Sequence, residues 1–322
     1  MASQMRLVAL VFAAALSFAA SAQPWPSKPM RLIVPFPPGG PTDVIGRSAA
    51  KILSDALGQP VIVDNRPGGS GTVGLAALAK AAPDGYTIGM TAITLATAPH
   101  LGPVPFDPFK DFSLITNLVQ TTPMIAAHPS FPANTLGELI SYARANPGKV
   151  AYGTPGVATV PHLAAEMLQG AAGIKLVHVP YKGTAQLSQD LLAGALTLSF
   201  ESSLTQAYPN IKAGKLKPIA MLSARRSALL PEVPTVAESG FPGISASPWF
   251  GFGGPTGLAP EQVARMHDIL VKGVREKEVI ERMATIGAEI TPSVSPAEFA
   301  AFVRTEHAKW GEVIRKAGVK AE

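Results

Sequence analysis

The chain has 322 residues, of which 47% are hydrophobic and only 15% are charged, a composition that supports a large buried core and argues against disorder. Its formal net charge is +5 without any basic run longer than Arg225-Arg226, which argues against nucleic-acid binding. There are no cysteines, so an exported form would have to be stable without disulfides.

The first 22 residues are typical of a secretory signal peptide. Arg6 supplies a positive charge, Leu7–Ala20 is an apolar stretch, and Ala20-Ser21-Ala22 matches the small-residue cleavage pattern. The apolar stretch is short for a membrane span, although a retained membrane anchor is the alternative. We therefore expect the mature chain to begin near Gln23 and to reside in a bacterial periplasm.

Short apolar runs alternate with amphipathic segments after residue 25. Helical and strand periodicities predict strands over Met30–Phe36, Val61–Val63 and Tyr86–Met90, with helices over Thr42–Leu57 and Val73–Ala81. This β-α-β-α-β order predicts a parallel sheet that is covered by helices on both faces.

The same alternation returns in the middle of the chain. It predicts further strands over Val150–Gly153, Leu176–Val179, Leu196–Phe200 and Lys217–Leu222, with helices over Pro161–Leu168 and Gln186–Leu192. Capping boxes at Thr135–Glu138 and Ser295–Glu298 mark two helix starts.

Two such sets of elements predict an α/β protein with two domains and a ligand cleft between them. We expect residues 23–122 plus 248–322 to form one domain and residues 123–247 to form the other. The expected hinges are the irregular segments Asn117–Pro123 and Pro242–Phe252. The remaining C-terminal segment is expected to be mostly helical and to pack on the first domain.

The strongest local feature is Pro35–Asp43, a Pro- and Gly-rich loop that joins a buried strand to a helix. Its glycines allow backbone N–H groups to approach a ligand, and the helix start offers free donors and a positive dipole end. These features suit an anion. A purely structural turn, with Thr42 or Asp43 as the helix N-cap, is equally open.

Three further turns of small residues precede helices, at Gly68–Thr72, Gly153–Thr159 and Lys182–Thr184. In an open parallel sheet such turns lie at the carboxyl ends of the strands, where ligands bind. Each turn alone has a structural explanation. Together with the Pro35–Asp43 loop they make four such turns, and the four together favour one shared cleft. Neither a Walker A loop nor a strand followed by GxGxxG is present, which disfavours nucleotide binding.

Catalytic patterns are weak. The sequence has no HExxH motif, no cysteine nucleophile and no GxSxG elbow, which disfavours a zinc site and a hydrolase. His162 stands at a helix start and could touch a ligand, while His178 lies within a strand and is expected in the core. Glu201 ends a strand, where it could accept from a ligand hydroxyl or amine, or cap a helix.

Taken together, these residues resemble the Bug family, the substrate-binding proteins of tripartite tricarboxylate transporters. The resemblance covers the whole predicted mature chain in order. It is carried by Trp25–Arg31, Pro35–Asp43, Asn65–Gly69, Pro83–Tyr86, Tyr152-Gly153, Pro161–Leu163, Val179–Gly183, Ile211–Lys215, Leu230-Pro231 and Val233–Thr235.

The resemblance implies a type II periplasmic-binding-protein (Venus flytrap) fold. Its cleft would hold an organic acid: a di- or tricarboxylate, an acidic amino acid or an aromatic carboxylate. Membrane subunits of a tripartite transporter would be the protein partners, and neither a cofactor nor a metal is expected. Together with the reasoning above, it predicts ligand contacts from Phe36, Pro38, Gly39, Gly40, Thr42, Asp43, Ala92, Thr94, Thr154, Gly156, Ala158, Thr159, His162, Lys182, Gly183, Thr184 and Glu201.

The sequence departs from the family pattern at a few cleft positions. Pro155 and Ala158 stand where family members often carry small polar residues, and Glu201 and Thr197 stand where aspartates are common. These departures leave the class of ligand intact and hint at a less polar ligand body. We expect a monomeric binding protein and no enzymatic activity. The alternative is a periplasmic sensory protein that presents its ligand to a receptor kinase.

Overall fold

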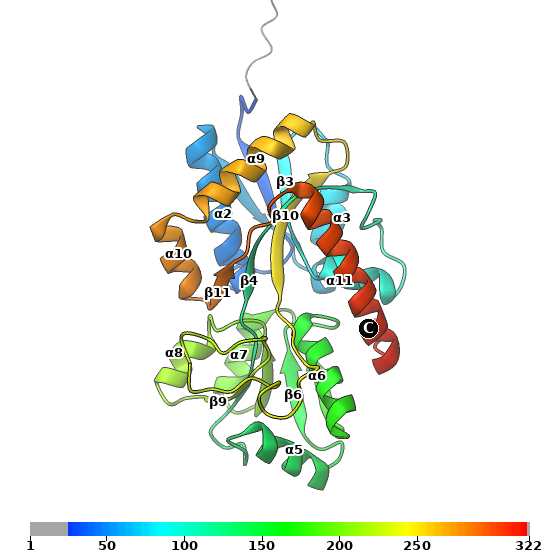
Figure 1. The fold of residues 1–322 in the computed structure, drawn as a ribbon, viewed down its shortest axis with the longest axis vertical. Helices are drawn as coiled ribbons and strands as arrows, with labels where there is room; N and C mark the ends of the chain where they lie inside the picture. Colours follow the sequence, from blue (N-terminus) through cyan, green and yellow to red (C-terminus); the bar gives the residue numbers. More distant parts are fainter. Residues whose placement is uncertain (1–24, 321–322) are drawn as a thin grey trace, which may run out of the picture.

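The protein is built from two lobes, each with its own β-sheet (Figure 1). This computed structural model describes residues 25–320, so the predicted signal peptide lies outside the described residues. No helix between residues 25 and 320 is long and apolar enough to cross a membrane.

The first sheet has the strand order β11-β4-β10-β3-β1-β2, and the second has the order β7-β6-β8-β5-β9. The strands are β1 (Met30–Val34), β2 (Val61–Asn65), β3 (Thr87–Ala92), β4 (Phe112–Thr121), β5 (Met124–Ala127), β6 (Ala151–Thr154), β7 (Val177–Pro180), β8 (Leu198–Glu201), β9 (Lys217–Met221), β10 (Trp249–Pro255) and β11 (Ala288–Ile290). The α-helices are α2 (Pro41–Leu57), α3 (Thr72–Ala79), α4 (Thr94–Thr97), α5 (Leu136–Ala145), α6 (Val160–Ala172), α7 (Thr184–Leu192), α8 (Ala207–Lys212), α9 (Pro260–Gly273), α10 (Lys277–Ala284) and α11 (Pro296–Ala317), with 3₁₀ turns η1 (Gly69–Gly71) and η2 (Ala98–His100).

The first sheet is mixed rather than wholly parallel. Strand β1 pairs in parallel with β2 and β3, as the β-α-β-α-β order predicts, whereas β10 runs antiparallel to β3 and β4, and β11 runs antiparallel to β4. The expectation of a parallel sheet is therefore confirmed for β1, β2 and β3 and is wrong only for the strands added by β4, β10 and β11. Strand β4 carries the chain toward the second lobe and β10 brings it back, so the two must point in opposite directions.

The two predicted hinge segments are not irregular throughout, because each contains part of a strand. Asn117–Thr121 belongs to β4, and Trp249–Phe252 belongs to β10. The glycines of β10 serve packing. A Cβ on Gly251 would lie 2.2 Å from the Phe299 ring, so glycine is needed there for helix α11 to approach the sheet.

The chain crosses between the lobes at adjacent points, because the Thr121 N–H donates to the Pro248 carbonyl at 2.9 Å. In the second sheet, β6 pairs in parallel with β7 and β8, and β5 runs antiparallel between β8 and β9. All five strands of this sheet lie between residues 123 and 247. The domain boundaries themselves stay a prediction.

The C-terminal helices cover the first lobe. Helix α9 contacts α2 and β4, while α11 contacts α4 and β4 and also reaches α6 of the second lobe (Figure 1). The indoles of Trp249 and Trp310 both donate to Glu306 Oε2, at 3.1 and 2.7 Å, and fix α11 in place. The capping box at the start of α11 is confirmed, because Glu298 N donates to Ser295 Oγ at 3.2 Å.

Candidate functional site

Two neighbouring cavities open between the lobes. We call them the small cavity, of about 220 Å³, and the large cavity, of about 830 Å³. Phe36, Pro37, Pro155 and Lys182 line both of them. The small cavity lies among the loops that follow β1, β3, β6 and β7, which are the carboxyl ends of parallel strands, where ligands gather in α/β folds.

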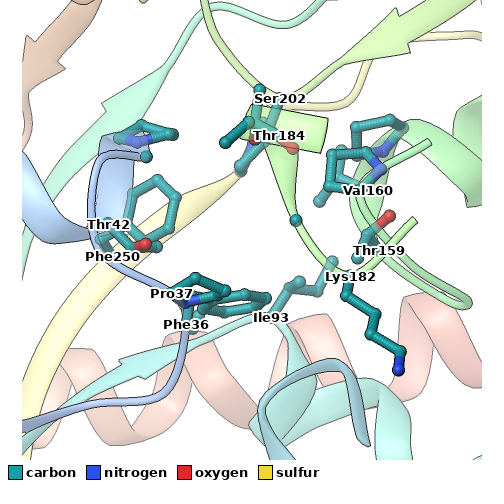
Figure 2. Close-up of a pocket in the computed structure, with 18 of the residues that line it drawn as sticks. Phe36, Pro37, Thr42, Ile93, Thr159, Val160, Lys182, Thr184, Ser202 and Phe250 are labelled. Carbon is teal, nitrogen blue, oxygen red and sulfur yellow. The ribbon is translucent and has the colours of Figure 1, made fainter. Parts of the chain in front are cut away.

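The wall of the small cavity is largely apolar (Figure 2). Its apolar side chains are Phe36, Pro37, Pro38, Pro41, Ala92, Ile93, Pro155, Val160, Pro161, Ala185, Pro248, Trp249 and Phe250. Its polar side chains are Thr42, Thr159, Lys182, Thr184, Gln186 and Ser202. Lys182 is thus the one charged residue among the described residues that line this cavity.

The structure brings many of the predicted residues together. The small cavity is lined by Phe36, Pro38, Gly40, Thr42, Ala92, Thr159, Lys182, Gly183 and Thr184, and Thr94 and Gly156 line the large cavity. The remaining predicted residues, which line neither cavity, are Gly39, Asp43, Thr154, Ala158, His162 and Glu201. Ligand contact by any lining residue stays a prediction.

The loop between β1 and α2 is held by a carboxylate of the protein itself, that of Asp43. Asp43 Oδ2 accepts from the Gly39 N–H at 3.2 Å and from Arg47 Nε at 2.9 Å, and Oδ1 accepts from Asn65 Nδ2 at 3.1 Å. Burial alone would raise the pKa of Asp43, but these hydrogen bonds, led by Arg47, lower it below its ordinary value. The N-cap of α2 is Gly40, so neither Thr42 nor Asp43 caps the helix. The start of α2 therefore already faces a carboxylate of the protein itself.

The loop between β6 and α6 is held by hydrogen bonds to side chains at its own two ends. Ala158 has a positive φ of 53°, and its N–H donates to His162 Nδ1 at 2.9 Å. The Thr159 and Thr154 hydroxyls both donate to the Gly156 carbonyl, at 2.8 and 3.0 Å. His162 thus acts on the loop backbone, which explains why it lines neither cavity.

The ring of His162 stacks on that of His178, with centroids 3.8 Å apart and planes inclined by 12°. His178 Nε2 lies 2.7 Å from Thr154 Oγ1, so both histidines support the same loop. Burial lowers the pKa of His162 to about 3, with His178 contributing, and burial lowers the pKa of His178 to about 4. Both rings are therefore neutral near pH 7, which leaves His162 Nδ1 free to accept.

The start of α7 faces the small cavity without a cap. Its N-cap is Gly183, with φ at 121° and no side-chain cap, and the next three residues, 184–186, line the cavity with it. Thr184 is only 7% exposed and lies in the lining of the small cavity. Free N–H groups at a helix start, with a positive dipole end, suit a carboxylate.

Glu201 is buried beside the site rather than in it. It is 1% exposed, and neither of its carboxyl oxygens has a hydrogen-bond partner within residues 25–320. Burial raises the pKa of Glu201 to about 7, and the nearby Ser199 hydroxyl acts in the opposite direction. The next residue, Ser202, does line the small cavity, and Glu201 caps no helix.

Several lining residues were not foreseen from the sequence. Trp249 and Phe250 come from β10, in a segment that we expected to be an irregular hinge, and Ile93 and Val160 flank predicted residues. The aromatic pair next to a predicted crossover was the available signal for the β10 contribution. Within the described part of the chain, no group of three His, Cys, Asp or Glu side chains is placed to hold a metal ion.

Comparison with known proteins identifies the family. The family model for the tripartite tricarboxylate transporter family receptor matches residues 45–319. The protein BugT of Bordetella pertussis is 36% identical, over 98% of this chain and 98% of that protein.

Two solved structures from Rhodopseudomonas palustris share the fold. Rpa4515 with adipate is 32% identical with a TM-score of 0.87, over 92% of this chain and 99% of that one. MatC with bound malate is 28% identical with a TM-score of 0.82, over 90% of this chain and 100% of that one. These matches confirm the predicted fold class and the predicted resemblance. The chain belongs to the family of tripartite tricarboxylate transporter receptors, which are periplasmic solute-binding proteins with two α/β lobes.

Proposed function

We propose that this protein captures a small organic acid in the small cavity and delivers it, chemically unchanged, to the membrane subunits of a tripartite transporter. The observation that carries the proposal is the uncapped start of α7, whose first residues line a cavity between two lobes. A helix start of this kind stabilises a carboxylate through N–H donors and its dipole. The relatives that hold adipate and malate support the same class of ligand.

A screen of organic acids tests the binding. Dicarboxylates, tricarboxylates, acidic amino acids and aromatic acids would be compared by thermal shift, and the best of them titrated by calorimetry. A ligand at 100 times its Kd stabilises the folded state by about 2.7 kcal/mol, which is readily measured as a rise in Tm. The bound acid should be recovered unchanged, as followed by NMR. Failure of every acid to raise the Tm, or its conversion into product, would contradict the proposal.

Delivery to a transporter needs a test in cells. Deleting the gene should abolish uptake of the acid that binds best, and expression in trans should restore it. If uptake persists while the loaded protein retains a receptor kinase in a pull-down, the role is sensory instead.

We also propose that the mature protein begins near Gln23 and works in the periplasm. The supporting observation is the charged, apolar and small-residue pattern of the first 22 residues. Mass spectrometry of the periplasmic fraction should find that N-terminus. Intact protein retained in the membrane fraction would contradict the assignment.

A further inference from the structure

The first residues of β10 reach the small cavity on a short stretch of strand between the crossover and a bulge. Pro248, Trp249 and Phe250 line that cavity one after another. The chain crosses from the second lobe at Pro248, and the register between β10 and β4 shifts directly after Phe250. Such a bulge interrupts the hydrogen-bond ladder. Only the pairs of Trp249 with Gln120 and of Phe250 with Val119 therefore tie this stretch to β4 before the bulge.

The side chains of Trp249 and Phe250 lie on opposite faces of the first sheet, as expected of neighbours in a strand. Phe250 packs in the core cluster that contains α2 and stands in the wall of the small cavity (Figure 2). Trp249 packs in the other cluster, where its ring centroid lies 5.8 Å from that of Phe299 and 5.5 Å from that of Phe302, both on α11. Whatever holds the indole of Trp249 therefore holds this stretch of β10 from the face covered by α11.

One carboxylate oxygen holds that indole together with a second one. Glu306 Oε2 accepts from Trp249 Nε1 at 3.1 Å and from Trp310 Nε1 at 2.7 Å. The two tryptophans are 1% and 0% exposed. An indole N–H can only donate, and a buried donor that loses its acceptor is costly, so both rings depend on Glu306 for their orientation.

Glu306 stands on a helix that is itself fastened to the first lobe (Figure 1). The ring of His307, the next residue, donates from Nδ1 to the Ala96 carbonyl at 2.9 Å, and His100 Nε2 donates to the His307 carbonyl at 2.9 Å. A Cβ on Gly311 would meet the His100 ring, so α11 packs closely against η2. These contacts set the position of Glu306 without any contribution from a ligand.

We propose that Glu306 is a positioning residue for ligand binding, which fixes Pro248–Phe250 at the wall of the small cavity by holding the indole of Trp249. Glu306 lines neither cavity, so it acts through Trp249 rather than by touching the ligand. A binding site is tight when hydrogen bonds behind the contacting residues lock them in place. This inference rests on the proposed function and adds to it a residue of the C-terminal helix, 57 positions along the chain from Trp249.

Two substitutions at Glu306 separate the hydrogen-bond acceptor from the negative charge. Glu306→Gln and Glu306→Met both remove the charge, but only glutamine keeps an oxygen that can accept. Calorimetric titration with succinate, adipate, malate, citrate, glutamate and benzoate identifies the acid of this set that binds wild type most tightly, and the variants are compared on that acid. Glu306→Met should bind it about tenfold more weakly, and Glu306→Gln should recover most of that loss. Loss of a negative charge would by itself favour an anion, so the charge cannot explain weaker binding.

The two tryptophans supply a matched control. Trp249→Phe and Trp310→Phe each remove one donor to Glu306, but only Trp249 lines the small cavity. Trp249→Phe should bind the same acid about fivefold more weakly than Trp310→Phe, whose affinity should stay within about twofold of wild type. Adding Glu306→Met to Trp249→Phe should cost no more than about twofold further, because the effect of Glu306 passes through this indole.

Melting curves of each free variant establish that it is folded at the temperature of the titration. Wild-type affinity in folded Glu306→Met, an equal loss in Glu306→Gln, or a loss in Trp310→Phe as large as that in Trp249→Phe would overturn the inference and leave the proposed function standing. If Glu306→Met does not fold, the comparison of Trp249→Phe with Trp310→Phe decides. Failure of every acid to bind wild type would contradict the proposed function itself and this inference with it.

Discussion

Glu201 links the protonation of one buried carboxyl group to the stability of the whole protein. Its ordinary pKa of 4.5 is raised to about 7 by burial. The folded state therefore keeps a proton that the unfolded state has already released between these values. Its contribution to stability is complete below pH 4.5 and is lost as the pH rises to about 7.

We expect Glu201→Gln, whose side chain stays neutral, to abolish the loss of stability that wild type suffers as the pH rises. Between pH 5 and pH 8 the variant should gain stability relative to wild type by up to about 3 kcal/mol. Urea unfolding at both pH values measures the difference, and the exposed Glu232→Gln controls for the loss of one negative charge. A constant difference between variant and wild type across this range would show that Glu201 is ionised throughout.

His162 and His178 change the stability of the fold with pH in the direction opposite to that of Glu201. Because burial holds the pKa of His162 near 3 and that of His178 near 4, both below the ordinary 6.5, their contribution to stability is present above pH 6.5. It is lost as the pH falls from 6.5 toward 4 and below. Because the variant and wild type share both histidines, the difference in stability between them does not contain the histidine contribution.

Replacing His162 should loosen the loop that it supports. His162→Ala leaves the buried Ala158 N–H without an acceptor and opens a cavity, at a cost of about 2–4 kcal/mol. His162→Asn keeps an oxygen that can accept, and should recover about 1 kcal/mol of that loss. Equal destabilisation of the two variants would mean that the ring stack with His178, rather than the Ala158 hydrogen bond, is what matters.

At the scale of elements, the start of α7 depends on the backbone of Gly183. Its φ of 121° is a conformation that residues with a Cβ rarely adopt. An added Cβ would lie 3.5 Å from Pro37 Cδ, an ordinary contact distance, so crowding is not the expected problem. Strain in the backbone would instead tilt the N–H donors away from the cavity.

We therefore expect Gly183→Ala to lose about 1–2 kcal/mol of stability and to bind the best organic acid of the screen at least tenfold more weakly. The matched control is Gly58→Ala at the C-cap of α2, where φ is 69° and no atom lies within 4 Å of an added Cβ. It should lose stability without losing affinity. Normal affinity in Gly183→Ala would remove the start of α7 from the binding site.

Gly39 shows a limit of reading loops from sequence. Its place in a Pro- and Gly-rich loop before a helix suggested close approach of a ligand. In the structure it lines neither cavity, and its N–H donates to Asp43. The ion pair of Asp43 with Arg47 follows from their i,i+4 spacing, so it could be predicted from the sequence. The contact of Asp43 with Asn65 was not accessible, because it joins the first turn of α2 to the end of β2.

The fold was predictable where local signals are strong. Periodicity located β1, α2, β6 and α6 closely, and capping boxes marked the starts of α5 and α11. The antiparallel pairing of β4 with β10 was missed, because it depends on where the chain returns from the second lobe. For the same reason the sequence did not place Trp249 and Phe250 at the cavity.

At the scale of the whole molecule, the lobes touch through their loops around the cavities. A Cβ on Gly156 of the second lobe would lie only 2.8 Å from Ser70 Oγ of the first. Helix α11 also bridges α4 and α6. Such contacts are expected of a closed form that a ligand stabilises by binding it better than an open form.

Small-angle scattering should therefore show a smaller radius of gyration with saturating acid than without it. The ligand that binds best by calorimetry should produce the largest change. An unchanged scattering profile at saturation would mean that the free protein is already closed in solution.

The hydrogen bond between Thr121 and Pro248 also has a consequence for the order of folding. Strand β10 can pair with β4 only after the chain between them, residues 122–248, has closed into a loop. Closing a long unstructured loop costs entropy, whereas a folded second lobe brings its own two ends together in advance. The first sheet, although it contains the N-terminal strands, would then be completed last. During synthesis, β1 to β3 would wait with the β3 edge unpaired, and β4 without a strand partner, until β10 emerges and inserts between them. The β3 edge and β4 are therefore the points most exposed to misassembly.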